Sequence, residues 1–139
     1  MVQLIVGKKG KGKTKHLLDK VNQEVKEVSG SIVYLDKSTK HMYELNNKVR
    51  LIDVSDYLID NSDAFLGFLC GIVSQDHDLE QMYLDSFLKI AHIEDDDITP
   101  IIARLDQISD KFHVNFVLSV SKDEVELPES LKEKIIVSL

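Results

Sequence analysis

Tryptophan is absent from this sequence, and cysteine, proline and arginine are scarce, with one Cys, two Pro and two Arg in 139 residues. The single Cys70 excludes an internal disulfide, and its apolar neighbours predict a buried, unreactive thiol, which favours a reducing compartment. A membrane span is also missing, because the longest apolar run, Ala64–Val73, is about half of the ~20 residues that cross a bilayer. No signal peptide is predicted, because the apolar segment Val2–Val6 has no basic region before it. These absences predict a cytoplasmic protein with no membrane span.

The length and the charge pattern narrow the class further. A chain of 139 residues, 43% of them hydrophobic, fits one domain covering residues 1–139. Residues 1–50 hold 11 Lys/Arg against 5 Asp/Glu, whereas residues 51–139 hold 6 against 19. This asymmetry indicates a basic binding face or a contact with a protein partner or a second copy, with scattered surface charge as the alternative. Nucleic acid is an unexpected partner, because the pI is about 5.1 and aromatic residues are few.

Apolar runs and helical periodicities alternate along the chain. Short runs rich in β-formers predict strands at residues 2–6, 31–36, 49–54, 81–85, 114–120 and 134–139. Helical spacing predicts helices at residues 13–28, from Ser55 or Ser62 to 73, and 99–112, with a short one after Pro128. The second helix is apolar on nearly all sides, and its Gly67 and Gly71 share one face that would let another backbone approach. The alternation predicts an α/β fold with a mainly parallel sheet covered by helices on both faces.

The most informative segment is GKKGKGKT, from Gly7 to Thr14, which matches G-x-x-x-x-G-K-[ST] between a predicted strand and a predicted helix. In this pattern the loop amides form a nest for phosphate oxygens, and the helix directs its positive dipole end at them. Lys13 can reach the β and γ phosphates, and the Thr14 hydroxyl can bind Mg2+. The predicted nucleotide-binding residues are Gly7, Lys8, Lys9, Gly10, Lys11, Gly12, Lys13, Thr14 and Lys15. The lysines other than Lys13 lie at non-required positions, so they form a solvated rim or add attraction for triphosphate.

On this Walker A segment and the order of elements, the chain resembles the P-loop NTPase superfamily. The resemblance implies a three-layer P-loop fold with ATP and Mg2+ as cofactors. The helix, strand and terminal strand expected after residue 85 resemble the core of the ATPase branch. This resemblance implies the strand order 5-1-4-3-2, with the 49–54 segment as an extra or edge strand. ATP is favoured over GTP, because the guanine-reading Asn/Thr-Lys-x-Asp signature of GTPases is absent.

P-loop NTPases usually have an apolar strand that ends in an aspartate, which positions Mg2+ through water. Asp85 after MYL is the favoured candidate, and Asp36 after VYL is the alternative. The resemblance therefore implies Lys13 and Asp85 as catalytic residues and Thr14 and Asp85 as metal-site residues. Ser119 and Ser121 either sense the γ phosphate or make hydrogen bonds at a strand end.

The residue after Asp85 departs from the ATPase pattern, in which a glutamate often orients the attacking water. Here it is Ser86, which predicts hydrolysis that is slow or needs assembly. The other candidate bases are Glu80, Asp53 and Asp78, and the only arginines that could serve as a finger are Arg50 and Arg104. The adjacent residues Asp76, His77 and Asp78 form a poor metal site, because neighbours in sequence cannot all point at one ion.

Three functions remain in competition at this point. The first is a small ATPase or switch with slow or assembly-dependent hydrolysis. The second is a non-enzymatic nucleotide sensor or scaffold for a protein partner, which the missing glutamate and the charge asymmetry motivate. The third is a small-molecule kinase, against which the scarcity of arginine argues.

Overall fold

The computed structural model describes residues 1–139 and has a six-stranded sheet at its centre, in which every pair of neighbours is parallel. The strands are β1 (Val2–Val6), β2 (Ser31–Asp36), β3 (Arg50–Asp53), β4 (Leu79–Leu84), β5 (Asn115–Val120) and β6 (Ile135–Ser138). They lie in the order β3-β2-β4-β5-β1-β6. The prediction of an α/β fold with a parallel sheet is confirmed.

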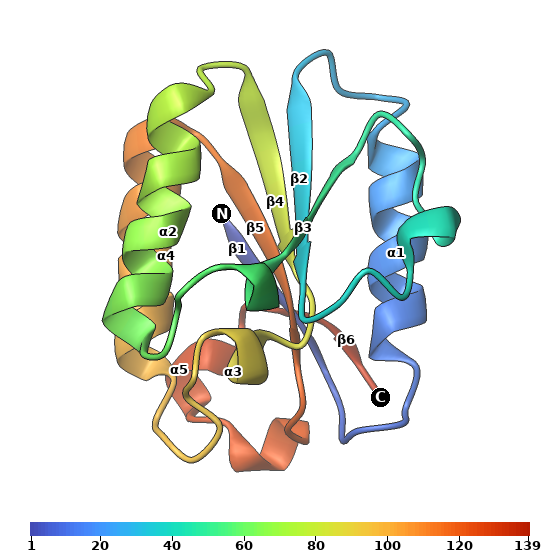
Figure 1. The fold of residues 1–139 in the computed structure, drawn as a ribbon. Helices are drawn as coiled ribbons and strands as arrows, with labels where there is room; N and C mark the ends of the chain where they lie inside the picture. The colour runs from blue at the N-terminus through green and yellow to red at the C-terminus, as the bar shows by residue number, and fades with distance from the viewer.

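Helices cover both faces of this sheet (Figure 1). Helix α1 (Lys13–Glu24) lies on one face, and α2 (Ser62–Gln75) and α4 (Thr99–Phe112) lie on the other. The shorter helices are α3 (Phe87–Ile90), α5 (Glu129–Lys132) and the 3-10 turns η1 (Met42–Glu44), η2 (Val54–Asp56) and η3 (Glu124–Glu126). Because all strands are parallel, their carboxyl ends share one edge, and Figure 1 shows the loop before α1 and the short helix α3 at that edge.

The predicted order 5-1-4-3-2 counted five strands and left the 49–54 segment as an extra or edge strand, whereas the sheet has six strands. Arg50–Asp53 pairs in parallel with β2 and becomes the edge strand β3. The remaining strands run β2, β4, β5, β1 and β6 across the sheet. The carboxyl ends of β4 and β5 therefore lie between those of β2 and β1.

Alternation of side chains along the strands divides the core in two. Tyr34 and Tyr83 face α1, with their rings stacked at 6.3 Å, and pack in the same cluster as Leu17 and Val21 of that helix. A larger cluster fills the opposite side, beneath α2 and α4. Two residues beyond the tyrosines, on the α1 side, the strands reach Asp36 and Asp85. The pleat thus brings two buried carboxylates to the edge where the strands end.

Helix α2 corrects two predictions. It begins after Asn61, whose side chain accepts a hydrogen bond from Ala64 N, and it buries only Phe65, Leu69 and Val73. Cys70 is exposed, so the predicted buried thiol is wrong. The two glycines of the helix meet no other backbone within 4 Å, so the predicted close approach is also wrong. The apolar content of a segment shows that it packs, but not how many of its sides are covered.

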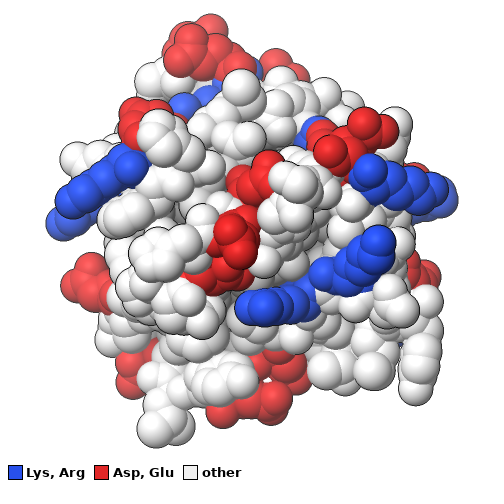
Figure 2. Space-filling model, turned by 90° about the horizontal axis from the view of Figure 1, so that it is seen from above, with Lys and Arg blue, Asp and Glu red and all other residues white.

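The surface mixes charges of both signs. Figure 2 views the edge at which the strands begin, and acidic and basic side chains alternate across it with no single-sign region. No helix is long and apolar enough to cross a membrane.

Candidate functional site

The loop between β1 and α1 has the backbone conformation that its glycines allow. Gly10 and Gly12 have φ of 86° and 94°, in the left-handed region that side chains with a Cβ rarely adopt. A Cβ at either position would meet no atom within 4 Å, so the requirement is for the backbone angle rather than for space. Gly12 in this conformation precedes the first residue of α1 and turns the chain into the helix.

Amide groups of this loop are left without protein acceptors. The N–H groups of Gly10, Gly12, Lys13 and Thr14 make no hydrogen bond, whereas that of Lys11 donates to Lys8 O and that of His16 donates to Gly12 O. The first turn of a helix always has N–H groups without a partner in the helix. Here the four residues that carry the free N–H groups all line one cavity. Because the dipole end of α1 adds partial positive charge, the loop is suited to binding an anion.

Lys13 is the one buried lysine of the chain, with 7% of its surface exposed. Its Nζ donates to the carbonyl oxygen of Lys8 at 3.0 Å, which folds the side chain back over the loop. Burial lowers the pKa of Lys13, and the negative charge of Asp85 partly opposes this shift. A buried ammonium group held by a single carbonyl is available to an incoming anion.

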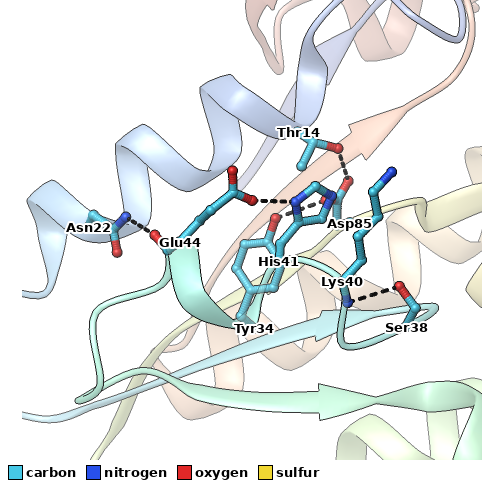
Figure 3. A network of polar contacts seen from close by, with 8 residues as sticks. All are labelled: Thr14, Asn22, Tyr34, Ser38, Lys40, His41, Glu44 and Asp85. Atoms are coloured by element: carbon cyan, nitrogen blue, oxygen red, sulfur yellow. Dashed lines mark hydrogen bonds and ion pairs between the residues drawn. The ribbon is translucent and has the colours of Figure 1, made fainter.

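Asp85 follows β4 and is the centre of a hydrogen-bond network (Figure 3). Its Oδ1 accepts from Thr14 Oγ1 at 3.2 Å, from Ser119 Oγ at 2.7 Å and from Ser86 N at 2.9 Å. Its Oδ2 accepts from the hydroxyl of Tyr34 at 2.8 Å. The carboxylate therefore connects the first turn of α1 to β2 and β5, although 71 positions separate Thr14 from Asp85.

Ser86 has φ of 52°, an unusual value for a residue other than glycine. Its N–H also donates to Ser119 Oγ at 2.9 Å, which holds the strained turn in place. The serine that follows Asp85 thus directs the chain away from the strand and into α3, at the edge of the cavity.

Asp36 lies beside this network. The pairs Leu35–Leu84 and Asp36–Asp53 fix the register of β2, so Asp36, the last residue of β2, lies level with Asp85, the residue after β4. It is 3% exposed, and its Oδ1 accepts from Lys37 N at 2.7 Å. Burial and the negative charge of Asp85 raise the pKa of Asp36 to about 6. The site thus contains two neighbouring carboxylates, of which one is difficult to ionise.

This pKa gives a prediction for Asp36→Asn in the absence of nucleotide and Mg2+. An aspartate with pKa of about 6 in the folded state and about 3.9 in the unfolded state is protonated more readily when folded. Its contribution to stability is present at low pH and is lost as pH rises from about 4 to above 6. The variant escapes that loss, so its advantage in the free energy of unfolding should grow by about 2 kcal/mol between pH 4.5 and pH 8. Urea unfolding at both pH values measures it, and an advantage of equal size at both would contradict the prediction.

These groups surround a cavity of about 720 Å3 at the carboxyl edge of the sheet, and only one of its 19 lining residues is hydrophobic. The lysines and acids that line it are Lys9, Lys13, Lys37, Lys40, Lys89, Lys122, Asp36, Asp85, Glu94 and Glu126. Serines 38, 86, 119 and 121, Thr14 and His41 add hydroxyl and imidazole groups. A cavity of this size and polarity can hold a charged ligand.

The loop lysines differ in what they contact. Lys9 and Lys13 line the cavity. Lys8 pairs with Glu126 at 3.2 Å and with Asp123 at 3.8 Å, and its contacts with Glu126 raise its pKa. Lys15 pairs with Asp19 at 3.6 Å, and Lys11 is exposed. The structure thus brings Lys9, Gly10, Gly12, Lys13 and Thr14 together, while Gly7, Lys8, Lys11 and Lys15 lie outside the cavity lining.

Sequence reasoning also proposed groups that lie elsewhere. Glu80 follows the first residue of β4 and accepts a hydrogen bond from Gly30 N, at the opposite edge of the sheet. Arg50 begins β3 and pairs with Asp76 at 3.6 Å. Neither these residues nor Asp53, Asp78 and Arg104 line the cavity. The Asp76-His77-Asp78 run does not form a group suited to a metal ion.

No protein-family model and no curated protein sequence matches this chain. Free amides, one buried lysine and a hydroxyl held by a buried carboxylate form an arrangement that can bind an anion with its counter-cation.

Proposed function

We propose that this chain binds a nucleoside triphosphate with Mg2+, as a P-loop NTPase-like protein. The observation that supports the proposal most strongly is the convergence of Lys13, the free amides of Gly10, Gly12, Lys13 and Thr14, and the Thr14–Asp85 pair on one cavity. In this proposal the amides and Lys13 bind the phosphates, and Thr14 and Asp85 hold the Mg2+. The ion would supply electrostatic stabilisation of the phosphate oxygens.

The residues present are suited to Mg2+ in two respects. Hydroxyl and carboxylate oxygens are the ligands that this hard cation accepts, and Mg2+ usually keeps several of its waters. Asp85 already accepts four hydrogen bonds. A carboxylate so engaged is suited to bind a metal through water, while the Thr14 hydroxyl can turn from Asp85 to the ion.

We further propose that hydrolysis is slow or requires assembly. Ser86 cannot accept a proton from water as a carboxylate can, and no arginine lines the cavity. Asp36 is the other buried carboxylate that lines the cavity, and it is the remaining group that can accept a proton, because its pKa of about 6 is close to neutral pH. ATP is the preferred nucleotide in the proposal, since the guanine-reading signature is absent from the sequence.

A non-enzymatic sensor that binds nucleotide and presents a surface to a protein partner is the second candidate. The same absence of a carboxylate at residue 86 favours it. The two functions differ in one measurable quantity, the release of phosphate from bound ATP. A small-molecule kinase has less support, because it would need both an acceptor and groups that cover the phosphates.

A thermal-shift panel tests the proposal. ATP and ADP, each with and without Mg2+, are compared with GTP and GDP on the wild-type chain. We expect Mg-ATP to raise the melting temperature most, because a ligand that binds only the folded state stabilises it by RT ln(1 + [L]/Kd). At 100 Kd this amounts to about 2.7 kcal/mol. Equal melting temperatures under all conditions would contradict nucleotide binding, and phosphate release in the same samples separates the ATPase from the sensor.

A further inference from the structure

The cavity extends beyond the part that the loop before α1 covers. Its lining residues come from the carboxyl ends of four strands that lie in the order β2, β4, β5 and β1. Three spacings of about 4.8 Å separate the ends of β1 and β2, or roughly 14 Å in all. A triphosphate bound at the β1 loop, with Mg2+ at Thr14 and Asp85, reaches β4. The end of the cavity at β2 and α3 is then left for another group.

Three lysines line that far end. Lys37 and Lys40 follow β2, and Lys89 lies in α3 after β4. None of them forms an ion pair, although acidic residues outnumber basic ones by 24 to 17 in the chain. Unpaired cations that line one cavity produce a local positive potential.

The segment after β2, which carries Lys37 and Lys40, is held in place by contacts with α1. Asn22 of α1 donates from Nδ2 to Glu44 O at 2.7 Å and accepts from Asn46 N at 2.8 Å, so one side chain anchors both sides of the turn after η1. His41 contacts Glu44, and Figure 3 shows His41 and Lys40 on the side of the segment where Thr14 and Asp85 lie. A fixed segment loses little freedom when it binds a ligand.

The charges at this end match a dianion better than a carboxylate. The cavity lining includes these three ammonium groups and the donors Ser38, Ser86 and His41, against the acidic groups Asp36 and Glu94. A tetrahedral phosphate offers several acceptor oxygens to donors that come from different directions, as these do.

We propose that Lys37, Lys40 and Lys89 form a second anion site, which binds the phosphate group of a second ligand beside the nucleotide. This inference rests on the proposed nucleotide function, because the nucleotide defines which part of the cavity remains. The ligand is a phosphate monoester or free phosphate, recognised by charge and by hydrogen bonds to its oxygens. A bound phosphate here would neighbour the γ phosphate, so the site suits a second substrate or an effector.

The test is a calorimetric titration of inorganic phosphate into the chain saturated with Mg2+ and a non-hydrolysable ATP analogue. We expect saturable binding that weakens at least tenfold in Lys37→Gln/Lys40→Gln. The matched control is Lys26→Gln/Lys48→Gln, which removes two exposed charges that lie outside the cavity and should leave phosphate binding unchanged. Glycerol 3-phosphate in place of inorganic phosphate distinguishes a monoester site from a free-phosphate site by which of the two binds more tightly.

Several results would overturn the proposal. They are no phosphate binding to the nucleotide-saturated chain, binding of equal strength in Lys37→Gln/Lys40→Gln, or an equal loss in the control variant. If the double variant does not fold, Lys89→Gln replaces it, because Lys89 is exposed and its removal disturbs no ion pair. A titration of the ATP analogue into the chain, carried out before the phosphate titration, separates this proposal from that of nucleotide binding. Absent nucleotide binding removes both, whereas nucleotide binding without phosphate binding removes only the second site.

Discussion

Lys13→Ala should lower the affinity for Mg-ATP by at least 100-fold and abolish the thermal stabilisation that the nucleotide gives. The expected loss corresponds to about 2.7 kcal/mol of binding free energy. It arises because the buried ammonium group is the only one that donates into the loop itself, to Lys8 O. Removing it leaves the free amides without the full charge that offsets the triphosphate.

The same variant should fold, because burial of this lysine opposes its charged form and lowers its pKa. Without nucleotide, its melting temperature should equal or exceed that of the wild-type chain. Lys11→Ala is the matched control: it removes a loop lysine that is exposed and does not line the cavity. Equal losses of ATP affinity in both variants would mean that the loop attracts nucleotide through its total charge, and would contradict the role assigned to Lys13.

Asp85→Ala should destabilise the folded chain by about 3 to 5 kcal/mol and remove the effect of Mg2+ on nucleotide binding. The stability loss follows from the buried donors that would lose their acceptor, above all Tyr34 OH and Ser119 Oγ, since each unpaired buried group costs about 1–3 kcal/mol. Urea unfolding measures the first effect. Nucleotide titrations with Mg2+ and with EDTA measure the second.

Two further variants separate the charge of Asp85 from its hydrogen bonds. Asp85→Asn keeps one oxygen for the donors that now reach Oδ1, and its amide can donate to the tyrosine oxygen, so it should fold with a smaller loss. It should still bind nucleotide without a Mg2+ effect. Tyr34→Phe removes one hydrogen bond and leaves the carboxylate, so it should keep the Mg2+ effect. A full Mg2+ effect in Asp85→Asn would contradict the assignment of the metal acid.

The local features of the site were predictable from sequence. The segment from Val2 to Thr14 contains a short apolar strand, glycines that permit left-handed backbone angles, and the start of an amphipathic helix. Each of these depends on residues within a few positions of one another, so periodicity and composition are sufficient to identify them. The same holds for the long helix that begins at Thr99 and for the strand that ends at Val120.

Three of the candidate residues that do not line the cavity lie at the opposite ends of the strands. Glu80, Asp78 and Arg50 have suitable chemistry, but they lie where strands begin, and the cavity lies where strands end. Asp85 and Asp36 were both named from sequence as rivals for one role. The register of β2 and β4 makes them neighbours instead, and that proximity contributes to the raised pKa of Asp36.

The sequence by itself determined the elements, their parallel arrangement and the loop that precedes α1, because these follow from local backbone preferences and from the burial of apolar runs. Tertiary structure alone decided that Tyr34 and Ser119 hold Asp85, that Cys70 is exposed, and that Lys37, Lys40 and Lys89 line one cavity. Those facts depend on strand order and register, which bring together residues tens of positions apart. No local pattern in the chain encodes such distances.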